Sequence, residues 1–182
     1  MKKIMFGLAI AAAVMAQASS FDWKTGMGGQ VYQPGSTSAT VSGLTAYLFD
    51  AAVTSQSAAF AALNSKTVPT SISGGLDNSS ISSGKITAKA TPFTWGSAGD
   101  TLTAFFVIVD GDNFYISNTA SMAADASATK TLSFSEKTAS QAALNTSGSY
   151  SGAGWYKAVP EPTSGLLMLV GLGALALRRR KA

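Results

Sequence analysis

The middle of the chain alternates short runs of β-forming residues with groups of turn residues. Its longest apolar run, residues 102–109, is nearly continuous, so it predicts a central strand that is buried on both faces. Gly111-Asp112 follows between Asp110 and Asn113 and suits a two-residue type II′ hairpin turn, because glycine accepts a positive φ at the first central position. Further strands are predicted at residues 44–49, 85–93, 114–117, 130–134 and 155–156.

Two other segments have the pattern of short helices. Residues 57–63 are rich in alanine, and Phe60 and Leu63 are spaced to form one buried pair. Residues 138–141 match a capping box and predict a second short helix that ends at Leu144.

Three segments lack a clear period. Residues 19–38 are interrupted by glycine and proline and are predicted to be loosely structured, with Val31-Tyr32 as a short edge strand. Residues 71–84 are predicted to be a loop, and residues 121–128 a small-residue linker or helical turn. The pattern as a whole predicts a mainly β, β-sandwich-like single domain with one or two short helices.

The first residues form the three parts of a secretory signal peptide. Lys2-Lys3 is the basic part, residues 4–15 are the apolar part, and Ala16-Gln17-Ala18 is the small-residue cleavage site. We expect export through the Sec translocon and cleavage by signal peptidase after Ala18. The chain then divides into the signal peptide 1–18, a mature Ser/Thr-rich β domain 19–157 and a C-terminal segment 158–182.

The C-terminal segment has three parts. Pro160-Glu161-Pro162 is expected to be extended, because each proline fixes its own φ and restricts the residue before it. Residues 165–177 carry no charge and predict a C-terminal hydrophobic helix, although they are at the short end for a membrane span and would also suit a buried core helix. The last part is a basic end that is expected to stay in the cytoplasm and to stop transfer, formed by Arg178, Arg179, Arg180 and Lys181.

This order of proline motif, apolar run and basic end resembles the PEP-CTERM sorting signal of exported bacterial proteins. The resemblance covers only the C-terminal segment. It implies processing by an exosortase-like membrane protease and contact with envelope or matrix polysaccharide. The chain would then be an inner-membrane-anchored precursor before it reaches the cell surface or the extracellular matrix. The Gram-positive sortase signal has the same order of parts, but its Leu-Pro-x-Thr-Gly pentapeptide is absent from this chain.

The charges of the mature domain are few and nearly balanced. Residues 19–157 contain seven lysines and eight acidic residues, so the net charge of +4 belongs to the two ends of the chain. This balance argues against a nucleic-acid partner. Serine and threonine make up 41 of these 139 residues, a composition typical of extracellular β proteins or of disordered stalks. Recurring aromatic and β-branched residues favour the folded alternative, and the absence of cysteine excludes disulfides.

The absence of histidine and cysteine removes most catalytic chemistry. A Ser-His-Asp triad and a His/Cys zinc site are impossible, which leaves a pair of carboxylates as the remaining route. Glu136 is the single glutamate of the mature domain, so we expect no enzyme, no catalytic residue and no cofactor. Residues 110–113 contain the oxygen ligands that calcium prefers but fail the EF-hand spacing, and a hairpin turn is the favoured interpretation.

Two functions remain open for the mature domain. The first is that of a structural or adhesive protein of the cell surface or matrix, without enzymatic activity. The second is that of a carbohydrate-binding module with a stacking platform of aromatic side chains, although tryptophans scattered singly more often belong to a core. The residues of this platform would be Trp23, Trp95 and Trp155 with Tyr47, Tyr115 and Tyr150. Ice binding is disfavoured because Thr-x-Thr occurs only in isolation, at residues 101–103 and 129–131.

Overall fold

The computed structural model describes residues 18–65, 75–136 and 139–159. Within these ranges the protein is mainly β, as predicted, with one α-helix, α1 (Gln56–Asn64), and one 3-10 turn, η1 (Ala139–Ala142). The strands are β1 (Ala18–Thr25), β2 (Thr45–Asp50), β3 (Asp77–Ser82), β4 (Lys85–Ile86), β5 (Phe93–Ser97), β6 (Thr101–Asp110), β7 (Asn113–Ile116), β8 (Ala120–Ala123), β9 (Lys130–Phe134), β10 (Leu144–Asn145) and β11 (Gly154–Lys157).

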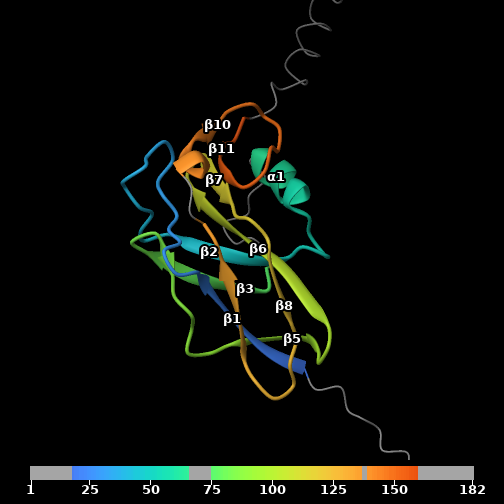
Figure 1. Ribbon diagram of the computed structural model, residues 1–182. Helices are drawn as coiled ribbons and strands as arrows, with labels where there is room; N and C mark the ends of the chain where they lie inside the picture. Colours follow the sequence, from blue (N-terminus) through green and yellow to red (C-terminus); the bar gives the residue numbers. More distant parts are fainter. Residues whose placement is uncertain (1–17, 66–74, 137–138, 160–182) are drawn as a thin grey trace, which may run out of the picture.

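The strands form a small sheet and a large sheet (Figure 1). In the small sheet, β1 lies between β5, to which it is antiparallel, and β9, to which it is parallel. The large sheet has the order β10-β11-β7-β6-β2-β3-β4, and β8 pairs with the first part of β6. The small sheet lies toward one end of the molecule, and α1, β10 and β11 lie at the other end.

The side chains of β6 alternate between two hydrophobic clusters. Phe106 lies in the cluster that joins the two sheets, with ring centroids 5.1 Å from Phe134 of β9 and 5.9 Å from Trp23 of β1. Phe105 lies on the opposite face, in the cluster that includes α1, and stacks on Phe49 of β2 at 5.6 Å. Both faces of the strand are therefore covered, which confirms the prediction from its continuous apolar sequence.

Helix α1 covers the face of the large sheet that is turned away from the small sheet. Ser55 caps its N-terminus, because the Ser55 Oγ accepts a hydrogen bond from the Ala58 N–H at 3.1 Å. Phe60 and Leu63 are buried, as their spacing predicts, and the ring of Phe60 lies 5.0 Å from that of Tyr156 in β11. The helix thus closes the second hydrophobic cluster.

A two-residue turn joins β6 to β7. Asp110 pairs with Asn113, and Gly111 has a φ of +59° whereas Asp112 does not have a positive φ. This is the type II′ pattern that the sequence predicts, and it supports the hairpin interpretation of the acidic residues 110–113.

The prediction of a loop over residues 71–84 is wrong for its second half, which forms β3 and the turn into β4. β3 pairs with β2, and its Ser79 and Ile81 side chains are buried while their neighbours are exposed. Ser83 and Gly84 both have positive φ, +49° and +72°, as a type I′ hairpin requires. Serine and asparagine have low β-propensity, so pairing with a distant strand makes this segment a strand.

The single strand predicted over residues 85–93 is also wrong. β4 ends at Ile86, and β5 begins at Phe93. The residues between them contact β1 and β3, because the Lys89 N–H donates to Asp22 at 3.0 Å and the Lys89 ammonium forms an ion pair with Asp77 at 2.6 Å. The residues between β4 and β5 therefore lie outside the sheet, although polar and apolar residues alternate in their sequence.

Two smaller corrections concern the segments after β7. Residues 121–128 are not wholly a linker or helical turn, since β8 pairs with β6 and the hydroxyl oxygens of Thr103 and Ser121 lie 2.8 Å apart. The second predicted helix is the 3-10 turn η1, and Leu144, where that helix was expected to end, belongs to β10. Both segments consist of small residues without a strong local preference.

Strand β1 lies in a segment that the sequence analysis predicts to be loosely structured. Phe21 and Trp23 point into the core with no exposed surface, while Ser20 and Lys24 point outward. The alternation was present in the sequence, but it is short and is followed by several glycines. This correction matters most, because β1 holds the small sheet together.

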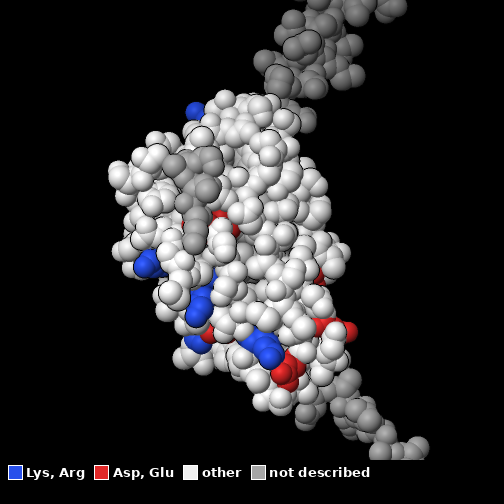
Figure 2. Space-filling model, viewed as in Figure 1, with Lys and Arg blue, Asp and Glu red and all other residues white. Residues whose placement is uncertain are grey.

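Charged side chains are sparse on the surface in Figure 2, and they gather toward the end that holds the small sheet. The region over α1 and β11 shows few charges, and the sequence of α1 contains none. The two ends of the molecule therefore differ in charge as well as in structure.

Candidate functional site

The last described residues are fixed to the domain by two hydrogen bonds. The Ala158 N–H donates to the Asp112 carbonyl oxygen at 2.8 Å, and the Val159 N–H donates to the Asn64 Oδ1 at 3.0 Å. Asp112 lies in the β6–β7 turn, and Asn64 is the last residue of α1. The C-terminal segment therefore leaves the domain at a defined point, directly after a residue that the fold holds in place.

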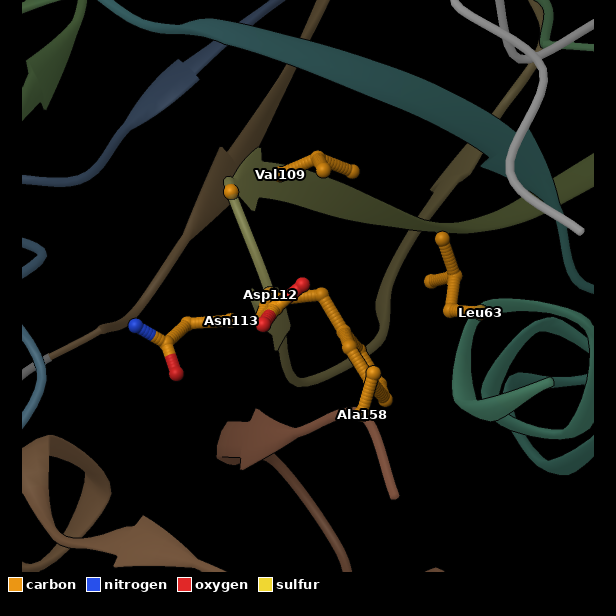
Figure 3. A pocket seen from close by; sticks show the side chains of 7 residues that line it. Leu63, Val109, Asp112, Asn113 and Ala158 are labelled. Atoms are coloured by element: carbon orange, nitrogen blue, oxygen red, sulfur yellow. The ribbon is translucent and has the colours of Figure 1, made fainter. Parts of the chain in front are cut away.

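A pocket of about 240 Å³ lies beside this point (Figure 3). Leu63 of α1, Val109 of β6 and Ala158 give it apolar surface, while Asp112 and Asn113 of the turn give it polar surface. The described residues contain no group of three or more side chains that could hold a metal ion.

Most of the site residues predicted from the sequence lie outside the described residues. This holds for Ala16 of the cleavage site, for the hydrophobic helix expected at residues 165–177, and for the sorting motif and the basic end. In the part of the chain that the structure describes, no helix has the length and apolar character needed to span a membrane. The sorting motif consists of Pro160, Glu161 and Pro162, and the basic end consists of Arg178, Arg179, Arg180 and Lys181.

Ala18 of the predicted cleavage site lies within the described residues. It is exposed, it is the first residue of β1, and its Cα partner is Ser97 of β5. Cleavage after Ala18 would make Ser19, which is fully buried, the first residue of the mature chain. The mature domain would then begin directly with a strand of the small sheet.

The tryptophans do not form a common exposed platform. Trp23 and Trp155 are buried, and their indole N–H groups donate to Asp77 at 2.7 Å and to the Tyr32 carbonyl oxygen at 2.6 Å. Trp95 is half-buried and donates to a carboxylate of β2 at 2.9 Å. Each indole joins segments that are distant in the sequence, so the interpretation as core residues is the one that the geometry supports.

Glu136 forms a buried polar cluster that the sequence analysis did not identify. Its carboxylate accepts hydrogen bonds from the Tyr115 hydroxyl, from the Asn118 N–H at 3.0 Å and from the Gln141 Nε2 at 3.1 Å. Burial raises the pKa of the Glu136 carboxyl, although these hydrogen bonds act in the opposite direction. Burial, together with the neighbouring carboxylate, also raises the pKa of Tyr115. The cluster connects the end of β9 to β7 and η1.

The raised pKa of Glu136 predicts a pH-dependent stability. The folded protein holds this proton more tightly than the unfolded chain does, so the contribution is complete below the ordinary value of about 4.5 and is lost as the pH rises through the folded pKa. We expect the free energy of unfolding of the parent to decrease relative to that of Glu136→Gln as the pH rises from about 4.5 through the folded pKa of Glu136. Urea unfolding at a series of pH values measures the difference.

The matched control for this prediction is Asp125→Asn. Asp125 lies at the surface and pairs with Lys130 at 2.9 Å; hydrogen bonds from Lys130 and from Ser127 lower its pKa. The contribution of Asp125 to the free energy of unfolding therefore has the opposite dependence on pH. It is lost as the pH falls through the lowered pKa of Asp125, in a more acidic range than that of Glu136. If the free energy of unfolding depends on pH in the same way for the parent and for Glu136→Gln, Glu136 has the same pKa in the folded and the unfolded states, which would contradict the prediction.

Residues 158–181 match the family described as the PEP-CTERM protein-sorting motif. The match covers the C-terminal segment alone, and it begins at Ala158, which the fold holds against the β6–β7 turn. The motif implies an exported protein that is processed by an exosortase. No curated protein and no solved structure matches the chain.

Proposed function

We propose that this protein is a non-enzymatic structural or adhesive protein of the cell surface or extracellular matrix, exported through the Sec translocon and cut by signal peptidase. The C-terminal segment presents the domain at the inner membrane until the exosortase acts. Envelope or matrix polysaccharide is the proposed surrounding of the mature domain. The observation that carries the proposal is the match to the sorting motif at residues 158–181, whose Pro160-Glu161-Pro162 follows directly after Val159, a residue held through its backbone by Asn64.

The short distance between domain and membrane supports this role for the C-terminal segment. Residues 160–164 separate Val159 from the apolar run. A fully extended chain spans about 3.5 Å per residue, so the domain lies within roughly 18 Å of the point where an inserted run begins. We expect the prolines to keep a motif in this gap extended, and the hydrogen bonds of Ala158 and Val159 fix the point from which it starts.

The chemistry of the mature domain supports a non-enzymatic role. Histidine and cysteine are absent from the sequence, and the Glu136 carboxylate is buried and accepts three hydrogen bonds from neighbouring groups. A surface with many hydroxyl groups and sparse charge (Figure 2) is suited to hydrogen bonding in a hydrated polymer matrix. Turnover of an ester, peptide or glycoside that is abolished by one Asp→Asn substitution would overturn this part of the proposal.

The sorting role is tested by comparing the full chain with a chain that stops after Val159. The shorter chain keeps both hydrogen bonds of the exit point but lacks the motif. In the native host, we expect the full chain to pass from the membrane fraction to the surface or matrix. We expect the shorter chain to enter the medium without a membrane-bound stage. The same distribution of both chains among the fractions would contradict the proposal.

A further prediction concerns the basic end. Replacement of Arg178, Arg179, Arg180 and Lys181 by glutamine is expected to weaken membrane retention and to release uncut protein, because the positive charges resist translocation. Immunoblots of membrane and medium with an antibody against the C-terminal segment measure the release. A control with four lysines keeps the charge and should be retained like the parent. Full retention of the glutamine variant would show that the charges do not stop transfer.

A further inference from the structure

We propose that copies of this protein assemble by exchanging β1, so that the N-terminal strand of one copy lies between β5 and β9 of another. The partner is therefore a second copy of this chain, and the exchanged element is Ala18–Thr25, shortened by one residue if cleavage follows Ala18. This inference goes beyond the sorting function.

Strand β1 occupies the middle position of the small sheet. It pairs with β5 over residues 18–21 and with β9 over residues 21–25, and both partners come from much later in the chain. If signal peptidase cuts after Ala18, β1 is joined to the rest of the mature chain only at its C-terminal end. Without β1, the small sheet would have two unpaired strand edges with a slot between them, which an identical strand from any copy would fill.

The large side chains of β1 are buried between the two sheets. Phe21 stacks on Phe93 with centroids 5.9 Å apart, and Trp23 meets the ring of Phe134 edge-on at 6.1 Å. The indole N–H of Trp23 also donates to Asp77 at 2.7 Å. Because Phe21 and Trp23 have no exposed surface, a domain with an empty slot exposes the core between its sheets. Capture of a β1 strand is therefore strongly favoured over leaving the slot open.

A short turn follows β1. Met27 is 97% exposed, and Gly28 has a φ of +72° with no atom near the position of a Cβ. Within the turn the Gly29 N–H donates to the Gly26 carbonyl oxygen at 2.9 Å, and on either side of it the N–H groups of Gly26 and Gln30 donate to the carbonyl oxygens of Phe134 and Glu136, each at 2.8 Å. Met27 and Gly28 lie between these two anchored positions and contribute no side chain to the core. Since an exchanged strand makes the same contacts as a strand in its own domain, this turn is the part that differs between the two states.

Strand β1 precedes both of its partner strands along the chain. β1 is made and exported before β5 and β9, so it has no partner in its own chain until those strands follow. The small sheet also lies at the end of the molecule opposite to α1 and β11, where the chain leaves toward the membrane (Figure 1). Neighbouring precursors can therefore meet through their small sheets.

The test uses the absence of cysteine from the chain. Ser20 and Thr94 are Cα partners in β1 and β5, on the side of the sheet that faces away from the core. Full-length Ser20→Cys and Thr94→Cys chains are expressed together in the native host, and the exported protein is oxidised mildly. Each chain has a single thiol, so a disulfide between the residue-20 and residue-94 peptides, detected by mass spectrometry, joins two copies.

The matched control is the pair Thr103→Cys and Ser121→Cys, expressed together in the same way. These positions face each other in β6 and β8, with hydroxyl oxygens 2.8 Å apart, but exchange of β1 does not bring them together from different copies. We expect on the order of tenfold more of the linked product for the β1–β5 pair than for the control. Equal amounts of the two products would overturn the proposal.

Two further variants keep the test decisive. A single chain with both Ser20→Cys and Thr94→Cys shows that this pair can form a disulfide, and once locked it should no longer exchange. Deletion of Met27 and Gly28 shortens the turn, so β1 cannot easily reach its own slot, and the product between copies should increase in this background. A smaller amount of the product between copies would contradict the role of residues 26–29 as the hinge of the exchange. Processing of the C-terminal segment is measured in the same strains. If processing is normal but the linked product is absent, strand exchange is wrong while the sorting function stands.

Discussion

A chain that carries Phe106→Asp is expected not to fold. Phe106 has no exposed surface, and the ring centroids of Trp23, Tyr115 and Phe134 lie 5.9, 6.0 and 5.1 Å from its own. The substitution removes these contacts and places an unpaired carboxylate between the sheets, which should lower the free energy of unfolding by at least about 4–5 kcal/mol. Domains of this size are stable by roughly 5–15 kcal/mol, so little or no folded protein should remain.

Circular dichroism and urea unfolding of the exported protein measure this effect. Phe105→Asp tests the other face of β6, where the ring stacks on Phe49, and should destabilise by several kcal/mol as well. Thr101→Asp is the control on the same strand, because Thr101 is exposed and its substitution should change stability by about 0.5 kcal/mol or less. Unfolding midpoints equal to that of the parent for both phenylalanine variants would contradict a strand buried on two faces.

The segments that could be predicted from the sequence are those whose local pattern and tertiary environment agree. β6 is apolar on both faces and is buried on both, and β2 places Ala46 and Leu48 in one cluster and Phe49 in the other. In α1, the buried residues recur at helical spacing. Gly111 is predictable for a different reason, because a two-residue hairpin leaves little choice of residue at a position with positive φ.

The missed strands are those that pairing with distant segments creates. β3 and β8 consist mainly of serine, asparagine and alanine, which have little β-propensity, and their partners β2 and β6 lie far away in the sequence. β1 has the alternation of a strand, but the glycines that follow it suggested a loose segment. In β1, the two large aromatic residues Phe21 and Trp23 are two positions apart, and this spacing alone indicates the buried face of a strand.

The candidate site was only partly predictable for a similar reason. The sorting motif is local, so its residues could be read from the sequence and agree with the match at residues 158–181. The hydrogen bond that Val159 donates to Asn64 joins two segments far apart in the chain, and no local pattern indicates it. The same holds for Glu136, whose three hydrogen-bond donors come from β7, the following loop and η1.

Replacement of Pro160, Glu161 and Pro162 by three alanines is expected to leave uncut precursor in the membrane. We expect the prolines to keep this segment extended, whereas alanine is the best helix former and would let the hydrophobic helix predicted at residues 165–177 continue toward Val159. Residues 160–164 would then span about 8 Å as a helix instead of roughly 18 Å as an extended chain. The exosortase loses both the extended peptide and the carboxylate of the motif.

Immunoblots of membrane and medium fractions from the native host, with an antibody against the C-terminal segment, measure the uncut precursor. Replacement of Thr163 and Ser164 by alanine is the matched control, because it alters the same gap but leaves the motif intact. The control should be processed like the parent, while the triple-alanine chain should remain almost entirely uncut. If the triple-alanine chain is processed as fully as the parent, the C-terminal segment does not act through its proline motif, and the proposed route to the cell surface is wrong.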